Sequence, residues 1–129
     1  MAGIPPNADI QYNVIDPGIS KNLPTTGAFV QQINVQKAFR IGIESIITTS
    51  GSVTSLAANL QGSMDCVNYF TFPLSSSGDA RVSGSLSGAG TYYFEKTDLS
   101  VNCIQIYYTW SGAGNITVQE FKKMHDANY

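Results

Sequence analysis

Apolar and polar residues alternate along short stretches of the chain from residue 28 onward. The ranges 29–35 and 39–44 each place apolar residues mainly at alternate positions. Because successive side chains of a strand point to opposite faces, this period indicates strands with one buried face. No stretch has the apolar spacing of a helix over several turns, and only residues 121–127 offer a short helical candidate.

Further β segments follow, separated by turn residues, at 56–60, 67–72, 82–86, 91–94, 103–110 and 115–121. The first two flank the turn Gly62-Ser63-Met64-Asp65 and are predicted to pair as a hairpin. The tetrapeptide Ser-Gly-Ala-Gly occurs at 87–90 and at 111–114. Since glycine adopts positive φ easily, both copies are predicted to be tight connections between antiparallel strands. The spacing predicts an all-β fold, an antiparallel, jelly-roll-like β-sandwich of about seven or eight strands.

The two ends of the chain differ from this pattern. Residues 1–27 hold four of the five prolines, and proline lacks the N–H group that a sheet ladder needs. We therefore expect an extended N-terminal arm over 1–27, with at most a short strand at 10–15. Such an arm lies on its own domain or reaches a neighbour. The β-sandwich domain is expected to span 28–121, followed by a polar C-terminal tail at 122–129.

Charged residues make up only 12% of the 129 residues, about half of the ~25% usual in soluble domains. The resulting surface of Ser, Thr, Asn, Gln and Gly suits a subunit of an assembly, and it equally suits a secreted binding module. A net charge of −2 with scattered Lys and Arg provides no basic stripe for nucleic acid. No apolar run approaches the roughly 20 residues of a membrane span. Because the first residues do not resemble a signal peptide, we expect synthesis in a cytoplasm.

Residue types that carry catalysis or bind metals are few. The two cysteines, Cys66 and Cys103, could pair, but two are too few for a disulfide framework. A reducing cytoplasm favours free thiols, and the sequence leaves their redox state open. The single histidine, His125, lies in the polar tail and offers neither a base for a nucleophile nor a set of zinc ligands. The nine acidic residues are dispersed, mostly in turns, where Asp caps backbone N–H groups. We therefore predict no catalytic, metal-binding or cofactor-binding residues and no enzymatic activity.

Aromatic residues gather in two consecutive β segments, as Tyr92, Tyr93, Phe94, Tyr107, Tyr108 and Trp110. Because neighbours in a strand point to opposite faces, some of these rings must leave the main core. Three interpretations stay open. The rings cover a sheet edge or pack under the N-terminal arm, they form a protein interface, where Tyr and Trp are enriched, or they form a platform that stacks on sugar rings.

Short motifs follow one another between residues 56 and 119: LQGSMDCVNY at 60–69, GAGTYYF at 88–94, IQIYYT at 104–109, GAG at 112–114 and ITV at 116–118. Their order and spacing resemble those of small β-sandwich structural proteins of tailed bacteriophages. Two positions depart from the pattern. Cys66 stands where a hairpin glycine is usual, which leaves the turn type open, and Asn102-Cys103 replaces an aromatic start of the penultimate strand, which indicates a smaller core residue. The N-terminal arm has no counterpart in the pattern.

The resemblance implies a virion component, either a capsid auxiliary or decoration protein or a tail or neck piece, that contacts other virion proteins. A homo-oligomer is expected, because virion proteins commonly lie on symmetry axes. The candidate interface residues are Pro5, Pro6, Tyr12, Tyr92, Tyr107, Trp110 and Tyr129. The alternative is a carbohydrate-binding sandwich for host-surface adhesion, in which exposed Tyr92, Tyr107 or Trp110 stacks on a surface glycan.

Overall fold

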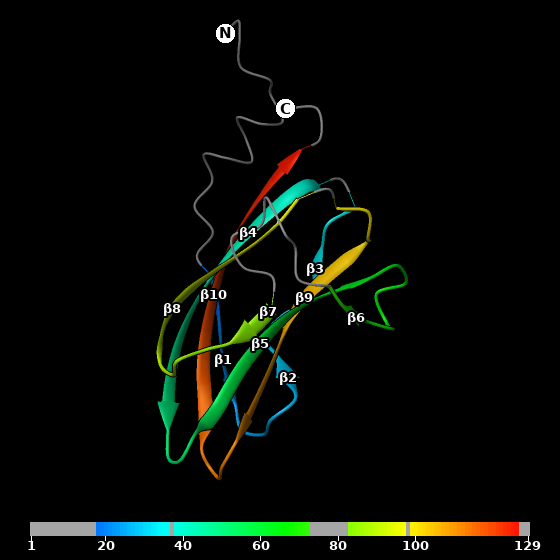
Figure 1. Ribbon diagram of the computed structural model, residues 1–129. Coiled ribbons are helices and arrows are strands. Elements are labelled where there is room, and N and C mark those ends of the chain that lie inside the picture. Colours follow the sequence, from blue (N-terminus) through cyan, green and yellow to red (C-terminus); the bar gives the residue numbers. More distant parts are fainter. Residues whose placement is uncertain (1–17, 37, 73–82, 98, 127–129) are drawn as a thin grey trace, which may run out of the picture.

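The computed structural model describes residues 18–36, 38–72, 83–97 and 99–126. Over these residues the chain forms two antiparallel β-sheets that pack together, and none of the residues is helical (Figure 1).

Sheet A has the order β1-β10-β4-β8, with β1 at Ile19–Leu23, β4 at Ala38–Ser50, β8 at Gly90–Lys96 and β10 at Asn115–Asp126. Sheet B has the order β2-β9-β5-β6, with β3 also pairing with β9 and β7 with β5. Its strands are β2 (Ala28–Phe29), β3 (Ile33–Asn34), β5 (Thr54–Ser63), β6 (Phe70–Thr71), β7 (Ser83–Ser85) and β9 (Cys103–Ser111). The predicted all-β, antiparallel sandwich is confirmed.

The hydrophobic core lies between the two sheets and follows the alternation of their strands. Along β4, Ile41, Ile43 and Ile47 are buried, and along β10, Ile116 and Val118 are buried. Strands β5, β8 and β9 complete the core with side chains that include Leu60, Phe94, Ile106 and Tyr108. Each fully buried apolar side chain contributes roughly 1.5–3 kcal/mol. The period of two therefore predicts the buried face of these strands correctly.

Strand β1 falls inside the predicted arm. It pairs with β10 at the edge of sheet A, from Ile19 opposite Glu120 to Leu23 opposite Ile116. Leu23 is the only buried residue of β1, so this strand has no apolar alternation that would reveal it in the sequence. The strand expected at 10–15 lies outside the described residues.

At the other end, β10 runs through Asp126. Its last residues pair with β4, from Lys122 opposite Ile43 to His125 opposite Arg40. Residues 122–126 therefore belong to sheet A. The prediction of a polar tail that begins at residue 122 is wrong, and the segment is not helical either. Lys123 and His125 are polar because they stand on the outer face of this sheet, and the segment therefore has no apolar stripe.

The two Ser-Gly-Ala-Gly connections join strands of opposite sheets. The copy at 87–90 leads from β7 in sheet B to β8 in sheet A, and the copy at 111–114 leads from β9 in sheet B to β10 in sheet A. The turn from β4 to β5 also crosses between the sheets, at the same end of the molecule as the second copy (Figure 1). The prediction of tight connections between antiparallel strands did not include this crossing, because alternation shows which face is buried but not which sheet the strand joins. The predicted pairing of β5 and β6 is confirmed. The predicted turn is misplaced, because Gly62 and Ser63 belong to β5 and the connection runs over residues 64–69.

Two of these crossing connections touch through their backbones at Gly114. Its N–H donates to the Ser52 carbonyl at 2.7 Å, and a Cβ added at Gly114 would lie 2.7 Å from that same oxygen. We expect Gly114→Ala to lower the free energy of unfolding by about 1–3 kcal/mol, because a methyl group here overpacks two fixed backbones. Thermal unfolding followed by circular dichroism measures the change. Ala113→Ser, at an exposed position of the same turn, is the control, and an equal melting temperature for both variants would contradict the expectation.

Candidate functional site

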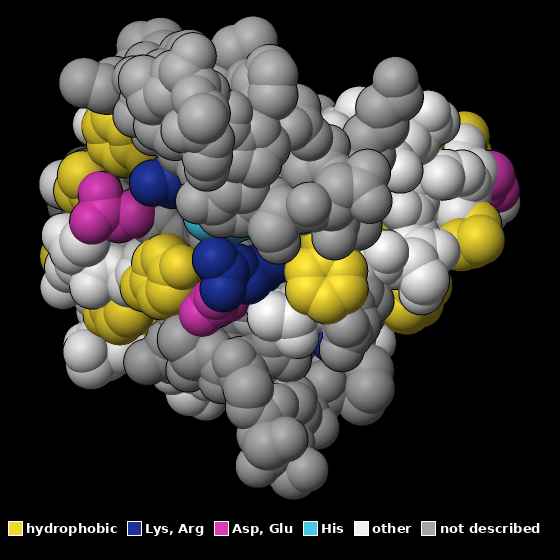
Figure 2. Space-filling view, turned by 90° about the horizontal axis from the view of Figure 1, so that it is seen from above, with side chains coloured by type: hydrophobic (Ala, Val, Ile, Leu, Met, Phe, Trp, Pro, Cys, Tyr) yellow, Lys and Arg dark blue, Asp and Glu magenta, His cyan; other side chains and the backbone are white. Residues whose placement is uncertain are grey.

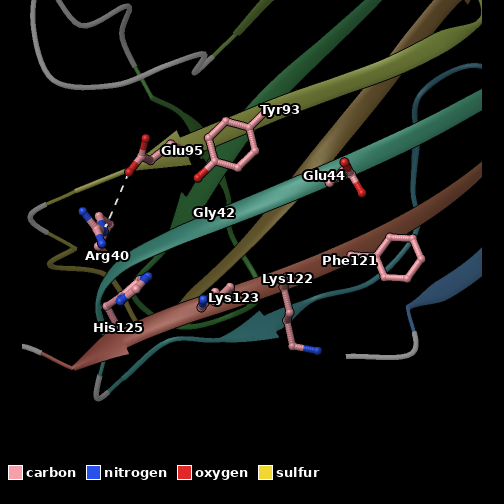
Figure 3. Close-up of a pocket in the computed structure, with 9 residues that line it drawn as sticks. All are labelled: Arg40, Gly42, Glu44, Tyr93, Glu95, Phe121, Lys122, Lys123 and His125. Atoms are coloured by element: carbon pink, nitrogen blue, oxygen red, sulfur yellow. Dashed lines mark ion pairs between the residues drawn. The ribbon is translucent and has the colours of Figure 1, made fainter. Parts of the chain in front are cut away.

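A hollow of about 380 Å³ opens on the outer face of sheet A, where Gly42 at the middle of β4 has no side chain. We call it the Gly42 hollow. The strand register surrounds it with three rows of outward side chains. Phe121, Glu44 and Tyr93 form the first row, and Lys123 and Glu95 lie on either side of Gly42 in the second. His125 lies beside Arg40 in the third. Figure 3 shows these side chains around the empty position on β4. In Figure 2, basic, acidic and hydrophobic side chains meet on this side of the molecule.

Tyr93 lies across the floor of the Gly42 hollow. Its ring atoms Cε1 and Cζ both lie 3.1 Å from the position that a Cβ of Gly42 would take. Tyr93 nevertheless remains 49% exposed. The hydroxyl end and the Cε1 edge of the ring therefore lie beside β4 at Gly42, while about half of the residue is open to solvent.

Opposite charges line the Gly42 hollow. Arg40 Nε lies 3.7 Å from Glu95 Oε2, in an ion pair marked in Figure 3. Partial burial and the positive charges of Arg40 and Lys123 lower the pKa of His125 below its ordinary 6.5, so its imidazole is neutral at pH 7. Partial burial and the Glu95 carboxylate raise the pKa of Tyr93, so its hydroxyl stays protonated. The hollow thus combines an aromatic face with charges of both signs.

The loop between β5 and β6 projects from sheet B (Figure 1). It carries exposed apolar side chains. Met64 is 62% exposed, Val67 is 75% exposed and Phe70 is 47% exposed. We call residues 64–70 the apolar tip. Single exposed apolar residues are ordinary on a protein surface, whereas a group of them marks an interaction surface.

Hydrogen bonds to Asp65 hold the apolar tip in one shape. Asp65 Oδ1 accepts from the backbone N–H groups of Val67 at 2.9 Å and Asn68 at 2.8 Å. These bonds, with those from the Asn68 and Ser63 side chains, hold the pKa of Asp65 well below its usual range. At the base of the tip, Asn102 Nδ2 donates to the Met64 carbonyl at 2.6 Å. The tip is therefore ordered before it meets any partner.

A disulfide joins Cys66 in the apolar tip to Cys103 at the start of β9. The prediction of free thiols is therefore wrong. Cys66 has a φ of +61°, in the left-handed region that glycine usually occupies. The two departures from the phage-protein motifs, a cysteine in place of a turn glycine and a cysteine in place of an aromatic residue, are thus the two halves of one cross-link. It ties the tip directly to the central strand of sheet B.

A buried carboxyl group links the two sheets. Glu120 on β10 is 1% exposed, and its Oε2 accepts a hydrogen bond from the Tyr108 hydroxyl on β9 at 2.6 Å. The Ser45 hydroxyl on β4 lies 2.9 Å from the same Tyr108 oxygen, and Gln31 Nε2 donates to Glu120 Oε1 at 3.2 Å. Burial raises the pKa of Glu120 to about 7, although these hydrogen bonds favour its ionised form. The two sheets are thus joined by a polar cluster inside an apolar core.

The predicted interface residues do not form one surface. Trp110 is 6% exposed and its Nε1 donates to the Gly114 carbonyl at 3.0 Å, so the expectation of an exposed Trp110 is wrong. Tyr92 is half-buried on sheet A, and its hydroxyl donates to the Gly88 carbonyl at 2.6 Å. Tyr107 is half-buried on sheet B. Pro5, Pro6, Tyr12 and Tyr129 lie outside the described residues.

Neither Glu120 nor Gly42 is a candidate from the sequence, and Tyr93 is named there only among the clustered aromatic residues. The alternation nevertheless contains a signal for Glu120 and for Tyr93. Glu120 follows the apolar positions Ile116 and Val118 at the same inward phase of β10. Tyr93 directly precedes the buried Phe94, so it must point outward. Gly42 forms a hollow only because β8 and β10 lie on either side of β4. No local sequence pattern predicts that arrangement.

Over residues 18–36, 38–72, 83–97 and 99–126, no three His, Cys, Asp or Glu side chains come together as metal ligands. No helix in this part of the chain is long and apolar enough to cross a membrane. Comparison with protein-family models and with curated protein sequences finds no match for the chain.

Proposed function

We propose that this protein is a non-enzymatic structural component of a phage virion, either a capsid auxiliary or decoration protein or a tail or neck piece. It is made in the host cytoplasm and acts through contacts with other virion proteins, as a homo-oligomer. The sequence motifs between residues 60 and 118 supply the phage assignment. The observation that carries the proposal is the strand order of the two sheets.

The strand order supports a jelly-roll topology. Strands β2 and β3 both pair with β9, and strands β6 and β7 both pair with β5, so each couple counts as one interrupted strand. Sheet A then holds the first, last, third and sixth strands in that order, and sheet B holds the second, seventh, fourth and fifth. We take this order as support for a double-sheet jelly roll, an architecture found in viral capsid and lectin domains. Since one fold serves many functions, the order supports the proposal by analogy.

The apolar tip provides a surface suited to the proposed contacts. Its hydrogen bonds and the Cys66–Cys103 disulfide order the loop beforehand, so little conformational entropy is lost when a partner covers it. Exposed Met64, Val67 and Phe70 then bury apolar area against that partner. We propose this tip, rather than Trp110, as the main protein contact within the described residues.

The carbohydrate-binding alternative loses the support of Trp110, which lies in the core, and of Tyr92, whose hydroxyl bonds to the backbone. The aromatic residue that favours this alternative is Tyr93, about half of which is exposed in the Gly42 hollow.

The proposal is tested on particles of the phage that encodes this chain. Particles are purified on a density gradient, and peptides of the chain are counted by mass spectrometry against those of the major capsid protein. We expect a constant number of copies per particle. Recovery of the chain only in the soluble fraction of the lysate would overturn the virion assignment.

A variant of the apolar tip tests how the chain attaches. In phage that carries Val67→Asp, we expect at least about a tenfold loss of the chain from particles, because a charge at the contact must be desolvated. Val67 is 75% exposed, so the isolated protein is expected to keep its melting temperature. Phe39→Asp makes the same change at an exposed apolar residue of sheet A and is expected to leave incorporation unchanged. Equal incorporation of the two variants would exclude the tip as the contact.

A further inference from the structure

We propose that the Gly42 hollow is a binding site for an uncharged saccharide, about one or two sugar rings in size, with Tyr93 as its stacking face. The hollow lies on the outer face of sheet A, whereas the apolar tip projects from sheet B (Figure 1). The two surfaces are therefore separate, and the saccharide site does not depend on the virion assignment.

The shape of the site follows from Gly42. A residue with a side chain at this position would fill the middle of the outward rows, and its Cβ would clash with the Tyr93 hydroxyl. The hollow measures about 380 Å³, near the lower end of the roughly 300–1,000 Å³ typical of small-molecule sites. It has room for a small ligand, and its open side lets a longer chain continue into solvent.

Tyr93 gives the site an apolar face of fixed orientation. The hydroxyl end and one edge of the ring lie against β4 at Gly42, and 49% of the residue is exposed. The face of an aromatic ring carries partial negative charge. The C–H groups on one side of a pyranose ring carry partial positive charge, so the two surfaces attract each other and exclude water. Because the Tyr93 ring is already supported, binding orders few additional torsions.

The polar side chains around the ring match hydroxyl groups rather than a net charge. Glu44 stands directly opposite Tyr93 in the strand register, and Arg40 pairs with Glu95 at the far side of Gly42. A sugar hydroxyl donates to a carboxylate and accepts from a guanidinium or ammonium group, so it uses both kinds of neighbour. On the outward rows around the hollow, Arg40 and Lys123 carry positive charge and Glu44 and Glu95 carry negative charge. His125 is neutral at pH 7. Lys122 also lines the hollow, but it shares the inward phase of Glu120, and its side chain points away from Tyr93 (Figure 3).

The formal charges of the outward rows thus cancel, and this balance favours an uncharged polyhydroxyl ligand over an anion such as a sialic acid or a phosphate. A bound anion is repelled by the carboxylates of Glu44 and Glu95, and a bound cation is repelled by the positive charges of Arg40 and Lys123. The proposal therefore commits to neutral sugars and treats acidic sugars and peptides as competing outcomes.

The experiment uses the full chain on an array of neutral and acidic glycans, followed by calorimetric titration of the strongest neutral glycan found. We expect a neutral glycan to bind, and Tyr93→Ala to weaken it by about tenfold or more through loss of the stacking face. Gly42→Ala is expected to weaken it similarly, because the methyl group displaces the Tyr93 ring from the floor without removing any polar group. Phe39→Ala removes an aromatic residue of similar exposure that does not line the hollow, and it is expected to bind normally.

Each outcome decides the proposal. Melting temperatures of the three variants show whether a loss of binding reflects unfolding, and Gly42→Ser offers a second filled hollow if Gly42→Ala unfolds. Binding of acidic glycans alone would overturn the charge argument. Binding that survives both Tyr93→Ala and Gly42→Ala would place the site elsewhere, and failure of every glycan on the array would overturn the proposal. None of these results bears on whether the chain is found in purified particles, so the saccharide proposal and the virion proposal can fail independently.

Discussion

Replacing both cysteines with serine is expected to lower the free energy of unfolding by about 4 kcal/mol and the melting temperature by roughly 10–15 °C. The disulfide between Cys66 and Cys103 closes a loop with a sequence separation of 37, and that loop contains β6, β7 and β8. Without the cross-link the unfolded chain gains the freedom to separate these ends, so unfolding becomes more favourable. Differential scanning calorimetry of the double variant and the parent protein measures the effect.

Two controls separate the cross-link from the local geometry of Cys66. The parent protein under reducing conditions is expected to melt close to the double-serine variant. The variant Cys66→Gly with Cys103→Ser is expected to be more stable than the double-serine variant by about 1–2 kcal/mol, because glycine adopts the φ of +61° found at Cys66 without strain. If reduction leaves the melting temperature unchanged, the disulfide contributes nothing to stability and this account fails.

The free energy of unfolding is expected to fall by about 3 kcal/mol between pH 4.5 and roughly pH 8 because of Glu120. Burial raises the pKa of this carboxyl from the ordinary 4.5 to about 7 in the folded protein. The folded state therefore holds the proton more tightly than the unfolded state does. This contribution is fully present below pH 4.5, declines as the pH rises through 7, and is lost above that. Chemical denaturation at a series of pH values measures it.

Glu120→Gln is the matched variant, because it keeps the size and polarity of the side chain and cannot ionise. Its stability is expected to lack the fall between pH 4.5 and 8, so that variant and parent diverge as the pH rises. His125 acts in the opposite direction, since its lowered pKa means that stability is lost as the pH falls through the unfolded value of 6.5. That effect is present in both proteins and cancels in the comparison. Parallel pH profiles would show that Glu120 stays ionised when folded.

Tyr108→Phe probes the same cluster from the other sheet. The Tyr108 hydroxyl donates to Glu120 at 2.6 Å and so favours the ionised carboxylate. Its removal is expected to raise the pKa of Glu120 further and to deepen the loss of stability at high pH. A variant whose pH profile overlays that of the parent protein would exclude this hydrogen bond as a determinant of the Glu120 pKa.

Strand positions could be predicted from the sequence because alternation is a local consequence of burying one face. Ile41, Ile43 and Ile47 on β4, and Ile116 and Val118 on β10, carry that signal. The signal fails where burial is not one-sided. Strand β1 buries only Leu23 at the edge of sheet A, and the end of β10 exposes polar residues on the open outer face. Neither segment differs locally from a loop or a tail.

The candidate sites show the same division. The low charge and the inward-facing alternation are properties of the sequence itself, and so is the requirement that Tyr93 points away from the buried Phe94. Which residues become neighbours across strands is not a property of the sequence itself, because β4, β8 and β10 meet only after the chain has crossed between the sheets. That crossing places Gly42 among Tyr93, Glu95 and Lys123, and it seats Glu120 against Tyr108.

By itself, then, the sequence determined an all-β chain with one buried face to each main strand. Only the tertiary structure decided that Cys66 and Cys103 are joined, that Trp110 is buried and that a carboxyl group lies between the sheets. The physical reason is the range of the interactions. Alternation is set by residues two apart in one strand, whereas a disulfide, a burial site or a buried hydrogen bond depends on strands brought together from distant parts of the chain.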